Sequence, residues 1–251
     1  MRAARASSTC RWTMSGAVEP PRGLVLLSAA WIAGSWLVSF GLRMPVQVSA
    51  GALTPGVRAM IVCCALGALV AWPMLRLCQP APQAPVRSTL LDAATLIVLL
   101  QTVIWPLRLA TTWAPQRTAL LDLVLASHML ACCGIVCIAL PRRSGAVRGV
   151  AMCACLLVAA GPASVLAAAG FADIASTLPR WIGGGFPSMG DAMRATSSLP
   201  EASAWQDAWI ACAGGALLAC AGAILGGVSG GPRISNARLR HASGADTVKG
   251  S

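Results

Sequence analysis

The chain has 251 residues, of which 57% are hydrophobic and only 11% are charged, and its formal net charge is +11. Soluble globular domains carry about 25% charged residues, so this composition excludes a soluble enzyme, a disordered chain and, despite the positive charge, a nucleic-acid-binding domain. Several uncharged apolar runs are long enough to cross a bilayer. The sequence therefore predicts an all-α, polytopic integral membrane protein, a bundle of about six transmembrane helices surrounded by lipid.

The apolar runs predict six membrane-spanning helices in chain order. The first two lie between arginines, the next two carry Asp92 and Asp122 in their first turns, and the fifth contains Gly161 and Pro162 at its middle. The predicted spans cover about residues 23–42, 59–75, 88–107, 118–140, 149–172 and 208–229, with an outer loop at 173–207. The remaining segments are a basic N-tail at 1–22 and a basic C-tail at 230–251.

Lys and Arg predict the orientation of the bundle, because these residues are enriched in cytoplasmic segments. With six spans and the N-terminus inside, thirteen basic residues fall on the inner side and six on the outer side. The Arg-rich and Ala-rich composition is typical of a GC-rich bacterial genome. We therefore expect a multi-pass protein of the bacterial inner (cell) membrane with cytoplasmic N- and C-termini.

His128 is the only histidine within a predicted span, and Cys132 lies one turn further on the same helical face. Imidazole and thiolate are ligands for soft metals such as Cu(I), which makes this pair a weak candidate for a metal site. Nine of the eleven cysteines lie within apolar runs, however, where thiols behave as small hydrophobic groups. We expect no metal and no cofactor, and a neutral His128 that hydrogen-bonds a neighbouring helix, with Gln101 as its natural partner.

Asp92 and Asp122 are the acidic groups near the starts of the third and fourth spans. Ionisable groups within a membrane are costly and are candidates for function, here as proton carriers in a transporter. A carboxylate in the first turn of a helix is also stabilised by the positive end of the helix dipole. The sequence favours this structural role for both residues.

Three glycines at intervals of four residues, Gly222, Gly226 and Gly230, follow one face of the last span. Small residues at this spacing let the backbones of two membrane helices approach closely. We therefore predict that this face packs against another helix of the bundle or of a second subunit.

The sequence contains no phosphate-binding loop, no HExxH motif and no CxxC pair. The leading hypothesis is a non-catalytic membrane subunit of a transport, export or assembly complex, working with other membrane or peripheral subunits and with any ATPase supplied in trans. One alternative is a membrane-embedded enzyme or soft-metal carrier centred on His128. Another is a structural partner that docks an extracytoplasmic protein through the loop at 173–207.

Overall fold

The computed structural model describes residues 22–41, 49–82, 84–111, 113–142, 144–161 and 202–229, and within these ranges the chain is all-helical. Five continuous helices are long and apolar enough to cross a membrane, and a sixth, α6, is shorter. The elements are α1 (Arg22–Trp36) with the π-helical turn η1 (Leu37–Gly41); α2 (Ala50–Leu66), η2 (Gly67–Ala71) and α3 (Trp72–Cys78), which run on as one helix; α4 (Pro85–Thr111); α5 (Pro115–Ala139); α6 (Gly145–Ala160); and α11 (Ala202–Ser229). The predicted fold class, a helical membrane bundle, is confirmed.

Several helices begin earlier than their predicted spans, because the sequence places good starting residues upstream. Ser49 precedes α2 and its hydroxyl accepts a hydrogen bond from the backbone N–H of Ala52 at 3.2 Å, which is an N-cap. Pro85 and Pro115 are the first residues of α4 and α5. Proline suits this position because its missing N–H would be unpaired there in any case. α11 likewise begins at Ala202, ahead of the predicted start of its span.

The helix that contains α2 and α3 accommodates a proline in its interior. Pro73 has no N–H to donate to the carbonyl of Leu69, and its ring crowds that carbonyl. The π-helical turn η2 lies just before the proline, with the N–H of Trp72 bonded to the carbonyl of Gly67. A π-helical turn is a common way for a membrane helix to absorb such a break.

α6 ends at Ala160, whereas the sequence predicted an apolar span that continues to residue 172. Gly161 has a φ of 81°, in the region that favours glycine, and its N–H bonds the carbonyl of Leu157 at 3.0 Å. Proline at position 162 cannot continue the hydrogen-bonding pattern of the helix. The rest of that predicted span, residues 162–172, lies outside the described residues.

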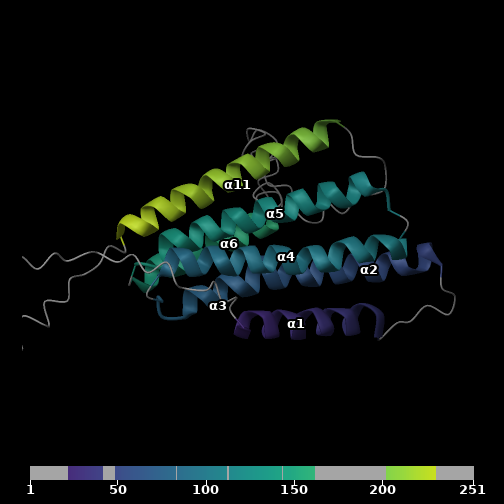
Figure 1. Cartoon of the computed structure of the whole chain (residues 1–251), viewed down its shortest axis with the longest axis horizontal. Helices are drawn as coiled ribbons and strands as arrows, with labels where there is room; N and C mark the ends of the chain where they lie inside the picture. The colour runs from purple at the N-terminus through teal and green to yellow at the C-terminus, as the bar shows by residue number, and fades with distance from the viewer. Residues whose placement is uncertain are drawn as a thin grey trace, which may run out of the picture.

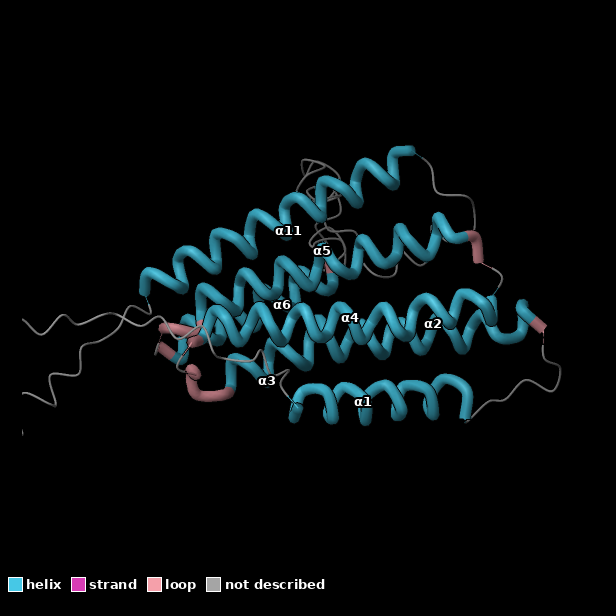
Figure 2. Tube along the Cα trace, in the orientation of Figure 1, coloured by secondary structure: helices cyan, strands magenta, loops and turns pink. Residues whose placement is uncertain are grey.

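α5 is the central helix of the bundle. Figure 1 shows α1 at one edge and α11 at the opposite edge, and the tube in Figure 2 shows the helices running roughly along one direction. α5 contacts α11, α4, α6 and α3, and residues on all its faces are buried, among them Leu121, His128 and Val136. The sequence of α5 is apolar all round, as expected for a helix enclosed by others.

The start of α1 and the end of α11 lie at the same end of the bundle. Gly23 borders the same cavity as Gln79, just after α3, while Gly226 lies beside Val86 near the start of α4. In Figure 1 the start of α1 and the yellow end of α11 both lie on the left.

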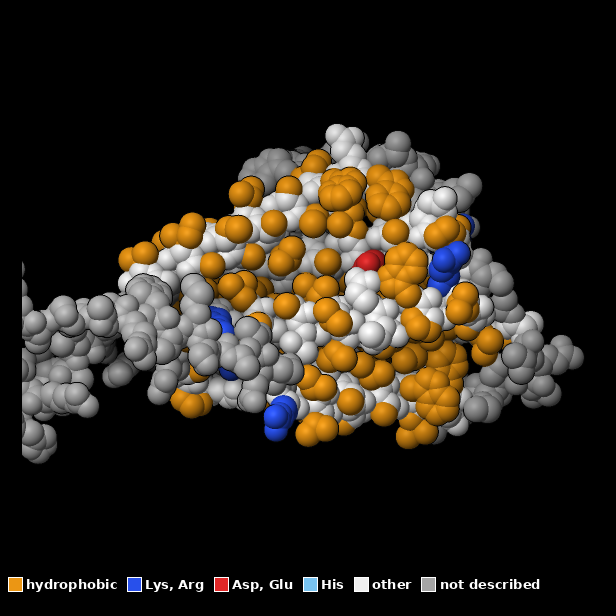
Figure 3. Space-filling model, viewed as in Figure 1, with side chains coloured by type: hydrophobic (Ala, Val, Ile, Leu, Met, Phe, Trp, Pro, Cys, Tyr) orange, Lys and Arg blue, Asp and Glu red, His pale blue; other side chains and the backbone are white. Residues whose placement is uncertain are grey.

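The outer surface carries the large apolar side chains expected of a protein in lipid. Figure 3 shows one face on which hydrophobic side chains cover the middle of the helices and basic side chains gather towards their ends. Exposed apolar residues occur on both edge helices, including Leu26 and Leu37 on the α1–η1 helix and Leu217, Ile224 and Val228 on α11. These exposed apolar faces and the five long helices identify a multi-pass membrane protein.

Arg148, in α6, ties the ends of two other helices together. Its guanidinium donates hydrogen bonds to the carbonyls of Leu77 and Gln79, both at 3.2 Å, and of Leu140 at 3.5 Å. These carbonyls lie at the C-terminal ends of α3 and α5, where helices have unpaired acceptors and partial negative charge. One side chain therefore joins three helices at this end of the bundle.

Candidate functional site

The first polar cluster within the bundle is an ion pair between α3 and α4. Arg76 Nε lies 3.4 Å from Asp92 Oδ2, and the two side chains are only 14% and 10% exposed. Arg76 Nη2 also donates to the hydroxyl of Ser88, which in turn donates to the carbonyl of Pro85 at 3.1 Å. Asp92 is two turns into α4, so the first-turn position predicted for it is wrong. The reason is that α4 begins at Pro85 rather than near Ser88. Arg76, which was expected to follow the second span, is part of α3.

The second polar cluster joins α4 to α5. Gln101 Nε2 donates to Asp122 Oδ1, and the indole N–H of Trp105 donates to Gln101 Oε1 at 2.7 Å. Asp122 also lies two turns into its helix, because α5 begins at Pro115, and its predicted first-turn position is likewise wrong. Both oxygen and nitrogen of the Gln101 amide are thereby used, in a contact between neighbouring helices of the kind that stabilises membrane bundles.

Gln101 is therefore bonded to Asp122 and Trp105, and not to His128 as the sequence predicted. α4 and α5 are antiparallel neighbours joined by a short connection around Trp113, which brings Gln101 level with the early part of α5. His128 lies six residues beyond Asp122, about 9 Å further along the axis at 1.5 Å per residue. The side chain of Gln101 does not span that separation.

His128 is completely buried in α5 and interacts with its own helix. Its Nδ1 lies 2.7 Å from the carbonyl oxygen of Val124 and 3.3 Å from the hydroxyl of Ser127. Because a carbonyl can only accept, Nδ1 carries the proton and donates it to Val124. This geometry fixes the imidazole ring against the preceding turn of α5.

The two adjacent thiols of α5 also reach backbone carbonyls. Cys132 Sγ lies 3.9 Å from the carbonyl oxygen of Leu69, the group that Pro73 leaves without its usual helical donor. Cys133 Sγ lies 4.0 Å from the carbonyl oxygen of Thr89 in α4. Within the ranges that the structure describes, His, Cys, Asp and Glu side chains form no group of three that could hold a metal ion. Among the described residues, no third side chain of these types joins His128 and Cys132 to complete the candidate metal site.

α5 and α11 approach one another backbone against backbone. A Cβ atom added to Gly222 would meet the backbone of Gly134, and one added to Gly134 would meet the backbone of Leu218. At Gly215 an added Cβ would lie 2.5 Å from the carbonyl oxygen of Ser127. Only glycine allows the two backbones to lie this close.

Between residues 208 and 226, the buried face of α11 consists of small residues. In chain order they are Ala208, Ala211, Gly215, Ala219, Gly222 and Gly226. The structure thus places Gly222 and Gly226, two of the three glycines singled out in the sequence, against α5; an added Cβ at Gly226 would lie 2.6 Å from the carbonyl oxygen of Cys137. Gly230 lies outside the described residues.

Sequence reasoning missed the contributions of Gly134 and Gly215. Gly134 is isolated in an apolar run, with no small residue four positions away on either side. The spacing of seven between Gly215 and Gly222 was the available signal, and Ser127 and Gly134 repeat it on α5. Because contacts advance in the same direction on both helices, α5 and α11 run parallel.

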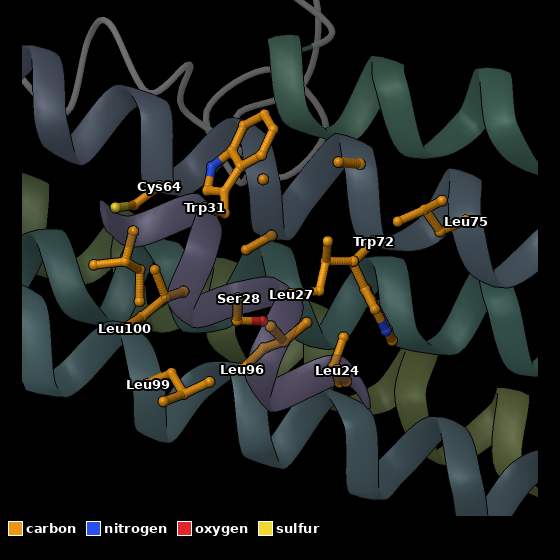
Figure 4. A pocket seen from close by; sticks show the side chains of 14 residues that line it. Leu24, Leu27, Ser28, Trp31, Cys64, Trp72, Leu75, Leu96, Leu99 and Leu100 are labelled. Atoms are coloured by element: carbon orange, nitrogen blue, oxygen red, sulfur yellow. The ribbon is translucent and has the colours of Figure 1, made fainter. Parts of the chain in front are cut away.

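A cavity lies beneath α1, between this helix and α2, η2, α3 and α4. Figure 4 shows its lining, which is almost entirely apolar, with Leu24 and Leu27 from α1 opposite Trp72, Leu96 and Leu100. Its volume is about 160 Å³. An apolar cavity of this size holds a small apolar molecule or part of a longer one.

Comparison with protein-family models, curated proteins and solved structures finds no match to this chain. In both polar clusters, described contacts join groups on different helices.

Proposed function

We propose that this protein is a non-catalytic, multi-pass membrane subunit of a transport, export or assembly complex, acting with other membrane or peripheral proteins. The observation that supports this proposal is the Asp122–Gln101–Trp105 network. The Asp122 carboxylate accepts a hydrogen bond from Gln101 on the neighbouring helix, and Trp105 in turn donates to the Gln101 amide. These bonds join α4 to α5, which is a structural role. The Arg76–Asp92 ion pair is used in the same way.

The contacts of His128 favour this proposal over the alternative of a membrane-embedded enzyme or soft-metal carrier. The imidazole is completely buried, and its Nδ1 donates to the carbonyl of Val124 on the same helix. A catalytic acid or base must reach the reacting group within hydrogen-bond distance. The position of His128 in the centre of α5 suits packing better than it suits such access.

The proposed setting is a bacterial inner membrane with both termini in the cytoplasm. The distribution of Lys and Arg supports this orientation, with thirteen on the proposed inner side and six on the outer. Gly23 near the start of α1 and Gly226 near the end of α11 lie at one end of the bundle, which fits an even number of crossings. No energy-coupling motif occurs in the sequence, so an ATPase, where one is required, is supplied by another subunit.

The proposal is tested by purifying the protein, tagged at its chromosomal locus, in a mild detergent. The expected result is a complex that contains a second protein in a fixed molar ratio, recovered again when that second protein carries the tag. A monodisperse species that contains this chain alone would contradict the proposal. An ATPase among the constant partners supports the transport version, and its absence from a complex of fixed composition supports an assembly role.

Two variants separate the proposal from its alternatives. His128→Leu keeps the volume of the buried side chain, so the variant is expected to retain both the fold and the partner; loss of cellular function with an intact complex would indicate chemistry at His128 instead. Deletion of residues 173–201 tests docking through the outer loop. If that deletion abolishes partner recovery while the protein still inserts into the membrane, the loop carries the interaction.

A further inference from the structure

The apolar cavity beneath α1 continues into a second, polar cavity at the end of the bundle. Leu24, Leu27, Trp72 and Leu75 line both cavities, so the two are parts of one cleft. The polar part has a volume of about 400 Å³ and is bordered by the cluster of Arg76, Gln79 and Asp92. We call the apolar part and this polar part together the α1 cleft.

The polar part of the α1 cleft lies near one end of the helices that border it. It is bordered by Gly23, the second residue of α1, and by Gln79, the residue that follows α3. The apolar part extends from there towards the middle of the helices, where it is bordered by Trp31 and Leu100. The cleft therefore has the polarity of a lipid, with a charged end near the ends of the helices and an apolar end towards their middle.

The charged end retains hydrogen-bonding capacity. Arg76 donates a hydrogen bond to Ser88 through Nη2; its buried Nε, 3.4 Å from Asp92 Oδ2, completes no hydrogen bond with a described residue, and no described contact uses Nη1. The indole N–H of Trp72, a residue only 4% exposed, lies beside the Asp92 carboxyl but completes no hydrogen bond of normal geometry with any described residue. A buried N–H without a partner costs free energy, so a bound acceptor at this point stabilises the protein.

We propose that the α1 cleft binds one phospholipid with an ethanolamine headgroup, from the leaflet at the Arg76 end of the bundle. The phosphate accepts hydrogen bonds from Arg76 Nη1 and the Trp72 indole, and the ammonium donates to the Asp92 carboxylate. An acyl chain enters the apolar part of the cleft. This inference does not depend on the proposed function, since it concerns only α1 and the helices beneath it.

Charge complementarity selects this headgroup. The Arg76–Asp92 pair presents one positive and one negative group side by side, and a zwitterionic phosphate and ammonium can match both. A glycerol headgroup has a phosphate but no cation for Asp92. A choline headgroup has the cation but no N–H to donate to a carboxylate oxygen.

The cleft is accessible to lipid from the side. Leu27 and Leu75, which line both parts, are 51% and 47% exposed, so they border the opening towards the bilayer. A volume of about 160 Å³ in the apolar part accommodates a segment of one acyl chain. The remainder of the lipid lies along the outer surface of α1, in contact with the bilayer.

The occupant is tested by native mass spectrometry of the full chain, purified from cells and exchanged through a lipid-free detergent. We expect one retained phospholipid of the mass of phosphatidylethanolamine. Ser28→Phe places a ring in the apolar part and should abolish retention, whereas Ala29→Phe, on an exposed position of the same helix, should not. Equal retention in the two variants, or no retained phospholipid in the unaltered protein, would overturn the proposal.

The headgroup is tested by adding single lipids to the delipidated protein, each with the same two acyl chains. Phosphatidylethanolamine should bind about tenfold more tightly than phosphatidylcholine, since one charge-assisted hydrogen bond distinguishes them. Asp92→Asn should reduce this preference, and thermal unfolding confirms that the variant remains folded. Tighter binding of phosphatidylglycerol than of phosphatidylethanolamine by the unaltered protein would show a site for anionic lipid and contradict the proposal.

Discussion

Gly222 of α11 lies directly against the backbone of Gly134 of α5, at the centre of a parallel helix pair. This contact, with that of Gly215 on Ser127, holds the edge helix α11 to the helix that forms the core of the bundle. The pair has little side-chain volume at its interface, so its stability depends on close backbone approach. Adding a single methyl group at this interface is therefore a sensitive probe of the structure.

Alanine substitution of two adjacent glycines should have opposite effects. Gly215→Ala places a methyl group 2.5 Å from the carbonyl oxygen of Ser127, and we expect it to lower the free energy of unfolding by about 1–3 kcal/mol. Gly214→Ala meets no atom within 4 Å and should stabilise the helix by about 0.5–1 kcal/mol. Thermal or denaturant unfolding in detergent measures both. Equal effects at the two positions would show that α11 does not pack on α5 in this register.

The Asp122–Gln101 contact predicts a difference between two substitutions of Asp122. Asp122→Asn keeps an acceptor for Gln101 Nε2 and removes a charge, so the free energy of unfolding should change by less than about 0.5 kcal/mol. Asp122→Ala removes the acceptor and should cost about 0.6–1.7 kcal/mol, which runs from the average to the largest value measured for hydrogen bonds between helices of a membrane protein. Unfolding in detergent distinguishes these outcomes. A loss of cellular function in a well-folded Asp122→Asn variant would favour a proton carrier.

Arg148 is expected to contribute more to stability than its neighbour Arg142. Arg148→Ala removes hydrogen bonds to the carbonyls of Leu77, Gln79 and Leu140, and should lower the free energy of unfolding by about 1–3 kcal/mol. The free energy of unfolding of Arg148→Lys should lie between those of the unaltered protein and Arg148→Ala, because one ammonium cannot reach carbonyls in both α3 and α5 as a guanidinium does. Arg142 is exposed, so Arg142→Ala is the matched control. Comparable losses for the two alanine variants would contradict the role assigned to Arg148.

The proposed orientation predicts which face of the membrane Cys78 occupies. This exposed thiol ends α3, at the end of the bundle proposed to face the cytoplasm. In a Cys10→Ser background, a membrane-impermeant maleimide should label Cys78 in inside-out vesicles and not in intact cells. A cysteine introduced at exposed Gln116, at the opposite end, in a background that lacks both Cys10 and Cys78 should show the reverse. Labelling of Cys78 from outside would invert the orientation.

The helices themselves could be predicted from composition, but their ends could not. Hydropathy alone marks each apolar run, because a bilayer requires about 20 apolar residues in sequence. Charged residues are not reliable ends, however, since Arg76 and Asp92 continue the helices and neutralise one another between them. The first-turn prediction for Asp92 is wrong because Pro85–Arg87 are already helical, which the apolar pattern does not indicate.

The contacts of the candidate site depend on the relative positions of helices, which a single sequence does not specify. Gln101 and Asp122 were both recognised as candidates, yet their pairing requires the antiparallel alignment of α4 and α5. The i to i+4 spacing of Gln101 and Trp105 was readable in advance, because it is a contact within one helix. Gly222 and Gly226 were found from their own periodicity, whereas Gly134 acquires its importance only from the helix that packs against it.

The parallel packing of α5 and α11 has a consequence for the order in which the protein is assembled. α5 and α11 are in direct contact, but α6 lies between them in the sequence. α5 therefore reaches the membrane well before α11 has been synthesised. Until then, acyl chains are expected to cover the shallow surface around Gly134, and α11 must displace them when it enters the membrane after α5. A chain stalled before α11 is complete should therefore insert and yet leave the Gly134 face of α5 uncovered, which makes the arrival of α11 the step that covers this face.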